Sequence, residues 1–379
     1  MRLGTGTPRR WIRPAGRLAV ALLPPALVFG GVRWLFAVAA SRAGFDAAYP
    51  GTWRRWDSGH YLDIAVRGWE LFSCAWLGGR PQDACGNAAW FPLYPWLLRP
   101  LIALGLRRET AGVWVSGVAT LAMLVVLWNG LLRERRVRGL VLLAMAGVFP
   151  GAVYAHAIFP TGLAQLCMIV AGVALVRRRW ALAGLAGGFL SMTYVTGVLL
   201  SAPNAIAAWL RSRSFQPAVV AGALSALGFG AVLLAQQLLL GHWNAWLLTY
   251  EKGLPGVAHP LTAFGAVVAP VLSEDLPRKT IALQALTVVG VLVSGGVVTT
   301  VTRSWKDPTR VWAAMAALLF WAFPLFAGRG VSLYRADALV LPVILLLVDL
   351  PVWVLLPFLF WFAVVAAAMG ELFFRGYLV

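Results

Sequence analysis

Long apolar runs separated by short polar and basic clusters dominate the hydrophobic pattern of this chain of 379 residues. Several runs reach about 20 residues, the length at which an α-helix crosses the hydrocarbon core of a bilayer. They predict helices over about residues 17–40, 111–132, 139–157, 159–176, 217–240, 280–302, 311–328, 332–350 and 351–370. The pattern therefore predicts an all-α polytopic membrane protein, whose first helix is retained rather than cleaved as a signal peptide.

Residues 180–210 are apolar but too long for one crossing, and basic residues flank both ends. Two short helices that meet near residues 193–197 would return the chain to the side from which it came. Broken helices are tolerated in a membrane where they line a cavity. With these two, the pattern predicts about eleven transmembrane helices in a single domain over residues 1–379, with a cavity beside the break.

The longest polar interval of the chain is the predicted loop at residues 41–110. It contains a short apolar stretch, 97–106, which is too short to span and is expected to lie at the membrane interface. Short loops such as 133–138 and 177–179 are rich in arginine and are expected to stay in the cytoplasm together with the N-terminus. The loop 41–110, a second polar loop at 241–279 and the turn at 332–335 then share the non-cytoplasmic face.

Composition supports the membrane interpretation and limits the partners. Hydrophobic residues make up 60% of the chain and charged residues 12%, with a mean hydropathy of +0.78, whereas soluble proteins have about 25% charged residues. The net charge is +18, and the basic residues that produce it lie between the apolar spans. They form no basic-aromatic module of the kind that binds nucleic acid, so the expected partner is the bilayer and not nucleic acid. Only three of the 32 basic residues are lysine, a bias typical of a GC-rich genome, and a bacterial plasma membrane is the expected location.

Three cysteines do not suffice for a metal site. Cys74 and Cys85 both lie in the loop 41–110 and form a disulfide if that loop faces an oxidising compartment; otherwise they remain thiols. Cys167 lies in an apolar run and is expected to be buried. Glycines at 184–188 are expected to allow close helix packing rather than to bind phosphate.

Two motifs of the first loop resemble a known family. The sequence Trp-Asp-Ser-Gly-His-Tyr at 56–61, followed by Phe-Pro-Leu-Tyr-Pro at 91–95, is similar to the PIG-V-like mannosyltransferases, which are glycosyltransferases of the GT-C type. The stretches Gly-His-Trp-Asn-Ala-Trp at 241–246 and Leu-Tyr-Arg at 333–335 are similar to later family motifs. The chain differs from the eukaryotic members in having no carboxylate at 159–162 and in having Ala336 after the arginine.

The resemblance implies a GT-C-like helical bundle with a large external first loop. It also implies an inverting mannosyltransferase whose donor is polyprenyl phosphate mannose. The donor is a lipid-linked substrate, so no cofactor is expected, and the acceptor, whether lipid, glycan or protein, is unknown. A precursor of a GPI anchor is not the expected acceptor, because the eukaryotic carboxylate element is absent.

Asp57 is the candidate general base. A base must take the proton of the acceptor hydroxyl as its oxygen attacks, and a carboxylate within hydrogen-bond reach can do so. The structural alternative is that Asp57 caps a helix or pairs with Arg54 or Arg55. His60 and Tyr61, three and four positions on, would share a helical face with Asp57 and orient it or bind the acceptor. Asp63 falls off that face and is expected to have a structural or solvent role.

The leaving phosphate needs a cation, for which Arg335 is the first candidate. Its alternative is a local pair with Asp337, while Arg54 and Arg55 are further candidates for the phosphate. The remaining candidate substrate contacts are aromatic or basic residues of the two predicted external loops: Trp56 and Trp90 as sugar-stacking rings, Tyr94, Lys252 and His259. The Phe-Pro-Leu-Tyr-Pro stretch is expected to shape the loop through its two prolines. No metal is expected.

Three other functions fit the sequence. A lipid-carrier flippase or transporter would require charges near the bilayer midplane or inverted repeats, and Arg33 is the one charge well inside a predicted span. A glycan ligase with a lipid diphosphate donor would require more phosphate-binding cations than Arg335. A non-catalytic subunit of a glycosylation complex would tolerate the loss of Asp57.

Overall fold

The computed structural model describes residues 14–80, 83–251, 257–328, 330 and 332–378. Within this part of the chain, six helices are long and apolar enough to cross a membrane. They are α1 (Pro14–Arg42), α4 (Arg108–Leu127) continuing into α5 (Arg136–Gly147), α10 (Phe215–Leu240), α13 (Leu276–Val301), α14 (Pro308–Gly328) and α16 (Val352–Phe374). The chain is thus an all-α membrane protein by the length and composition of its helices, and the count of eleven crossings stays a prediction.

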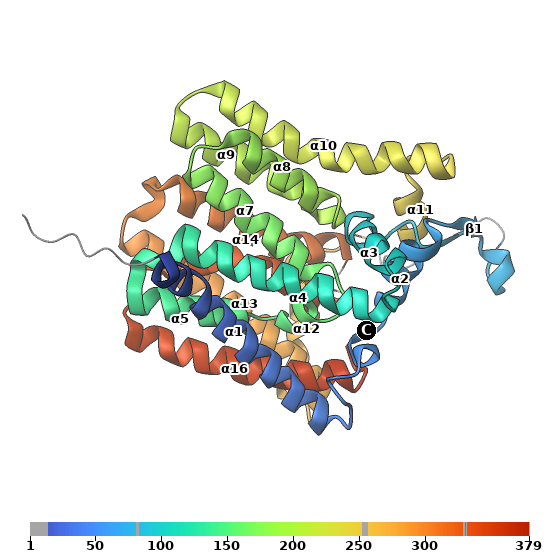
Figure 1. The fold of residues 1–379 in the computed structure, drawn as a ribbon, viewed down its shortest axis with the longest axis horizontal. Helices are drawn as coiled ribbons and strands as arrows, with labels where there is room; N and C mark the ends of the chain where they lie inside the picture. Colours follow the sequence, from blue (N-terminus) through green and yellow to red (C-terminus); the bar gives the residue numbers. More distant parts are fainter. Residues whose placement is uncertain (1–13, 81–82, 252–256, 329, 331, 379) are drawn as a thin grey trace, which may run out of the picture.

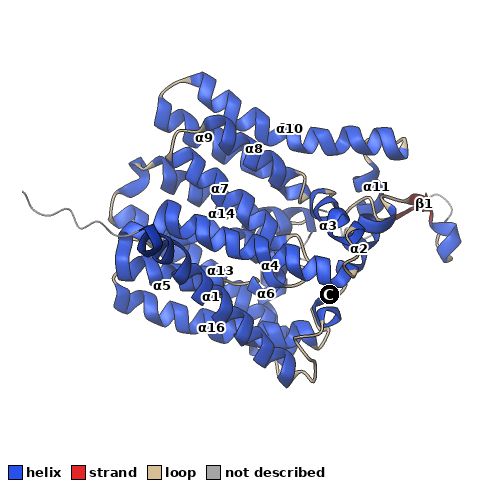
Figure 2. Ribbon diagram, viewed as in Figure 1, coloured by secondary structure: helices blue, strands red, loops and turns tan. Residues whose placement is uncertain are grey.

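Shorter helices complete the bundle, which is helical almost throughout (Figure 1, Figure 2). They are α2 (Ser58–Arg67), α3 (Leu93–Ala103), α6 (Ala152–His156), α7 (Thr161–Val176), α8 (Trp180–Ser191), α9 (Ser201–Ser212), α11 (Ala245–Glu251), α12 (Pro260–Val268) and α15 (Leu333–Ala336). Single turns of 3-10 helix cover Pro50–Trp53, Cys74–Leu77, Arg133–Arg135, Ala269–Leu272 and Ser304–Lys306, with longer ones at Val195–Leu200 and Asp337–Leu346 and a π-helical turn at Trp128–Leu132. The hydrophobic pattern did not predict the small antiparallel hairpin of β1 (Leu71–Ser73) and β2 (Ala84–Gly86).

Close contact between α8 and α10 depends on glycine, as predicted for residues 184–188. The two helices lie side by side in Figure 1. A Cβ atom on Gly188 would lie 2.7 Å from the carbonyl oxygen of Leu224, and one on Gly228 would lie 2.0 Å from the carbonyl oxygen of Gly188. Lipid provides no hydrophobic force between helices, so backbones that approach this closely gain their stability from packing.

The segment 180–210 is broken where the sequence predicts a break. Helix α8 ends at Ser191, an irregular stretch follows, and a 3-10 helix over Val195–Leu200 leads into α9. The carbonyl oxygen of Met192 accepts a hydrogen bond of 3.0 Å from the backbone N–H of Leu93, at the start of α3. The break therefore contacts the first loop, whose backbone supplies a hydrogen-bond donor to one of the carbonyl groups that the break leaves without a helical partner.

Three predicted boundaries are wrong. The helix expected over 139–157 is interrupted between α5 and α6, where Gly151 has φ = +80° and a Cβ atom on it would lie 2.9 Å from the carbonyl oxygen of Tyr334. The helix expected over 332–350 is instead α15 followed by the 3-10 helix over Asp337–Leu346, which contains Pro342. Both stretches carry proline, which breaks the helical hydrogen-bond ladder.

The third difference concerns the short helix of the first loop, which was expected over 97–106 but begins at Leu93. The Phe-Pro-Leu-Tyr-Pro stretch was expected to be loop, but its last three residues form the first turn of α3. Pro95 is tolerated there because the first N–H groups of a helix have no partner within the helix.

Replacement of Gly228 by alanine tests the contact between α8 and α10. The added methyl group would collide with the backbone of α8 and cost about 1–3 kcal/mol, the usual range for overpacking. Gly230→Ala is the matched control, since no atom lies within 4 Å of its Cβ position. We expect a melting temperature lowered by several degrees for Gly228→Ala only, measured on purified protein in detergent; equal melting temperatures would contradict the close packing.

Candidate active site

The loop that precedes α2 is anchored by Trp53. Its ring is buried, the indole nitrogen donates a hydrogen bond of 2.9 Å to the carbonyl oxygen of Ala47, and its own carbonyl oxygen accepts one of 3.2 Å from the N–H of Ile158. Trp56 then takes a positive φ of 42°, a conformation that a bulky residue seldom adopts. This turn brings Asp57 to the position just before α2.

Asp57 forms an ion pair with Arg335 of α15. The two residues are 278 positions apart, and neither the alternative pairing of Asp57 with Arg54 or Arg55 nor that of Arg335 with Asp337 is found. Asp57 occupies the N-cap position of α2, yet its side chain makes no capping hydrogen bond. The side chains of Asp57 and Arg335 keep 27% and 24% exposure, so a ligand can reach the pair.

Arg335 is held in position from two directions. One guanidinium nitrogen donates a hydrogen bond of 2.8 Å to the hydroxyl of Ser332, and the group lies 5.9 Å from the centre of the Phe159 ring. Arginine over an aromatic face gains cation–π attraction. The sequence singled out the 159–162 stretch for its missing carboxylate; the structure shows that its phenylalanine lies beside the arginine.

Gln284 of α13 positions the short helix that carries Arg335. Its amide nitrogen donates to the carbonyl oxygen of Tyr334 at 2.9 Å and to the carboxylate of Asp337 at 2.8 Å, while its amide oxygen accepts from the N–H of Gly151 at 3.2 Å. One buried side chain thus forms hydrogen bonds with the backbone of both irregular segments, the one at Gly151 and the one at Tyr334. Sequence reasoning missed Gln284, although a polar residue inside an apolar span was a visible signal.

Aromatic residues surround the ion pair. Tyr61 is buried and lies edge-on to Phe159, and Tyr154 is edge-on to Phe159 and stacked near Tyr334 at 6.1 Å between ring centres. Burial, with the charge of Asp57 nearby as a smaller cause, raises the pKa of Tyr61 well above its usual value, so its hydroxyl stays protonated. The hydroxyl of Tyr194, in the break after α8, forms a hydrogen bond of 3.0 Å with the hydroxyl of Thr161. Neither Tyr154 nor Tyr194 was singled out from the sequence.

His60 stacks on Trp90, with ring centres 3.6 Å apart and an interplanar angle of 18°. Both residues were predicted to contact substrate, and the structure brings them together beside Asp57. Burial lowers the pKa of His60, although the charges of Asp57 and Asp63 oppose the shift. His60 is therefore a neutral imidazole that remains able to accept or donate a proton.

The other predicted substrate residues that the structure describes either have partners of their own or are exposed. Arg54 pairs with Glu109 at 3.7 Å, and Arg55 donates to the carbonyl oxygen of Phe374 at 2.8 Å. The ring of Trp56 is 51% exposed, so it is open to solvent or a ligand. Tyr94 is fully buried, and its hydroxyl hydrogen bonds to the carbonyl oxygen of Gly112 and to Ser116, which ties α3 to α4. His259 is exposed before α12 and Lys252 falls outside the described residues.

Asp63, for which a structural or solvent role is expected, pairs with two arginines. Its carboxylate lies 3.3 Å from Arg108 and 3.6 Å from Arg67, and the first of these pairs joins α2 to the start of α4. In the part of the chain that the structure describes, no group of three or more histidine, cysteine, aspartate or glutamate side chains comes together, and independence from metal stays a prediction.

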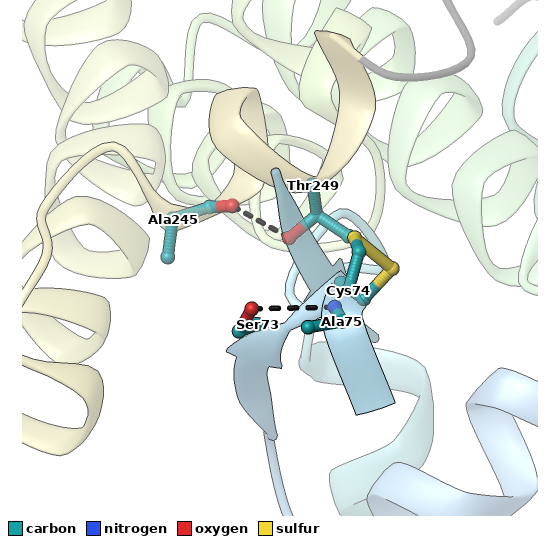
Figure 3. The surroundings of a disulfide bond; sticks show 6 residues. Ser73, Cys74, Ala75, Ala245 and Thr249 are labelled. Carbon is teal, nitrogen blue, oxygen red and sulfur yellow. Dashed lines mark hydrogen bonds between the residues drawn. A yellow bond between two sulfur atoms is a disulfide. The ribbon is translucent and has the colours of Figure 1, made fainter. Parts of the chain in front are cut away.

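The two predicted external loops contact each other. Cys74 and Cys85 form a disulfide that closes the β1–β2 hairpin, and α11 lies against the hairpin (Figure 3). Buried Gln236 of α10 donates to the carbonyl oxygen of Ala88 at 2.8 Å and accepts from the N–H of Trp246 at 3.0 Å. The second loop, predicted only as a polar loop at 241–279, contains the helices α11 and α12.

No protein-family model matches the chain, and a search of curated proteins finds no match either. The chemistry of the site must therefore be argued from its residues. They offer an accessible carboxylate, a cation beside it, a neutral imidazole and a wall of aromatic rings. This combination suits proton abstraction next to an anionic group.

The lowered pKa of His60 predicts a pH effect on stability. The unfolded chain binds a proton at His60 near pH 6.5, whereas the folded protein binds it at lower pH, so stability falls as the pH drops below about 6.5 and stops falling below the folded pKa. Melting temperatures of wild type and His60→Gln between about pH 7.5 and 5.5 test this. We expect the wild type to lose more stability than the variant; parallel curves would contradict the shift.

Proposed function

We propose that the chain is a membrane glycosyltransferase of the PIG-V-like, GT-C type. It moves mannose from polyprenyl phosphate mannose to an acceptor at the outer face of a bacterial plasma membrane. One observation carries the proposal: the candidate base Asp57 and the candidate phosphate ligand Arg335, far apart in sequence, form an accessible ion pair among aromatic side chains. During transfer the anomeric carbon lies between the base and the phosphate ligand, so the two side chains must start near each other and separate to admit the sugar.

In the proposed reaction, Asp57 takes the proton of an acceptor hydroxyl while that oxygen attacks the anomeric carbon. The bond between this carbon and the phosphate oxygen breaks, and the configuration inverts. The phosphate leaves with the bonding electrons, and Arg335 binds its additional negative charge. Aromatic rings such as Trp56 and Trp90 supply faces on which a sugar can stack.

The ion pair also suggests how the donor prepares the base. Arg335 cannot bind a phosphate in full while it is paired with Asp57, so the donor must take the guanidinium over from the carboxylate. Asp57 is then freed at the moment when the leaving group is bound. The cost of separating the pair is offset by the new arginine–phosphate hydrogen bonds, which are among the stronger kinds in proteins.

Arg33, the charge that suggested a flippase, has a structural explanation. Its guanidinium lies 4.0 Å from the centre of the Trp53 ring and donates a hydrogen bond of 3.3 Å to the carbonyl oxygen of His156. An intramembrane charge with such partners stabilises α1 against the first loop. This favours the transferase over the transporter.

Asp57→Asn tests the base. We expect purified protein in nanodiscs to transfer radiolabelled mannose from polyprenyl phosphate mannose to a membrane glycolipid extract, and the variant to be slower by about 10²–10⁴-fold, the usual contribution of a general base. Asp63→Asn is the matched control, since it removes a carboxylate six positions further along the chain, and it should retain most activity. Equal turnover by Asp57→Asn and wild type would contradict the assignment of Asp57 as the base.

Arg335→Gln and Arg335→Lys test the phosphate ligand. Loss of a hydrogen bond to a charged group costs about 1.5–3 kcal/mol, so we expect the glutamine variant to raise the KM for the donor about tenfold or more. Lysine keeps the charge but not the planar fork, and should recover part of the loss. An unchanged donor KM in both variants would assign Arg335 a structural role only.

A further inference from the structure

We propose that a second site, at the other end of the bundle, binds a phosphate group. The structure contains a cavity of about 320 Å³ where α4 passes through its π-helical turn into the 3-10 turn over Arg133–Arg135. The 3-10 helix over Asp337–Leu346 and the start of α14 complete it. Helix α4 begins at Arg108, beside Asp63 of α2, and its 20 residues rise about 30 Å. The cavity is thus remote from Asp57 and Arg335.

Arg310 is the central residue of this cavity. Its side chain lines the wall and is nine-tenths buried, and one terminal nitrogen is paired with Asp349 at 2.5 Å. The other terminal nitrogen is buried and has no hydrogen-bond partner among the described residues. A buried guanidinium N–H left unpaired is costly, so an acceptor in the cavity would stabilise it.

Two neighbouring arginines also have a buried guanidinium nitrogen without a hydrogen-bond partner in the described part of the chain. Arg138 donates to the carbonyl oxygen of Val348 and Arg211 to the hydroxyl of Thr309, and both acceptors belong to residues that line the cavity. The Nε atom of each is buried without a partner among the described residues. One incompletely paired guanidinium group therefore lines the cavity, and two more bind residues of its wall.

The charge balance favours an anion. Arg133, Arg135 and Arg310 line the cavity together with two carboxylates, Glu134 and Asp307. Counting the arginines that bind its wall residues and Asp349, which pairs with Arg135 and Arg310, five arginines stand against three carboxylates. The N-terminus of α14 adds the positive end of a helix dipole of 21 residues. Arginine forks match the geometry of phosphate oxygens, and this chemistry assigns a phosphate monoester or diester as the ligand.

The phosphate group can come from a lipid headgroup or from solution, and both sources meet the same arginines. The test uses full-length protein in detergent and isothermal titration calorimetry at constant ionic strength. One arm titrates dihexanoyl-phosphatidylglycerol, and the other titrates inorganic phosphate. Binding of the lipid alone identifies a headgroup site; binding of phosphate, with displacement of the lipid, identifies a site for free phosphate.

The double variant Arg133→Gln/Arg135→Gln removes two exposed cations of the cavity, so it should fold, and an unchanged melting temperature will verify this. We expect it to weaken binding of the ligand by about tenfold or more, in line with the loss of charged hydrogen bonds. Arg179→Gln is the control, because this exposed arginine lies in the turn between α7 and α8, outside the cavity. Absence of binding in both arms, or equal weakening by the control, would overturn the proposal. Neither readout depends on transferase activity.

Discussion

An apolar bundle can hold irregular backbone only if the polar groups of that backbone find partners, and this structure depends on that constraint. Three buried glutamines supply partners. Gln165 donates to the carbonyl oxygen of Ala338 at 2.8 Å, Gln236 to that of Ala88, and Gln284 to that of Tyr334. Each amide lies on a regular helix and reaches a segment that is not a long helix. Since an unsatisfied carbonyl in hydrocarbon costs several kcal/mol, these amides stabilise the breaks around which the candidate site is built.

The ion pair between Asp57 and Arg335 follows from this arrangement. Gln284 fixes the backbone before Arg335, Gly151 allows α15 to approach, and Trp53 anchors the loop that leads to Asp57. The pair is therefore preorganised by contacts that do not involve a substrate. In a low-dielectric environment such preorganised charges act strongly on a developing anion. The two charges are rigidly supported and both are partly exposed. Such an arrangement is compatible with a site in which a ligand replaces one member of the ion pair.

The two ends of the bundle use arginine differently. At one end Arg335 interacts with Asp57, with Ser332 and with the face of Phe159. At the other end Arg138, Arg211 and Arg310 each keep a buried nitrogen without a partner in the described chain. The orientation of a membrane protein depends on an excess of arginine and lysine in its short cytoplasmic loops. This requirement concerns only the presence of the charges and not their burial. Their burial around a cavity is a further property, and it belongs to the folded protein.

The sequence by itself determined the membrane class, the long helices, the break after α8 and the identity of Asp57 and Arg335 as candidates, because apolar length and unusual polar residues are local signals. It did not determine the ends of α5 and α6 or the 3-10 helix after α15, although Pro150, Gly151 and Pro342 were visible. A proline marks a disruption of the helical ladder, but whether the chain bends, breaks or continues depends on what packs against it. Only the tertiary structure decided that Asp57 pairs with Arg335, and that Arg54, Arg55 and Asp337 have other partners. Several oppositely charged residues stood closer in the sequence, and the choice among them was made by distance in space.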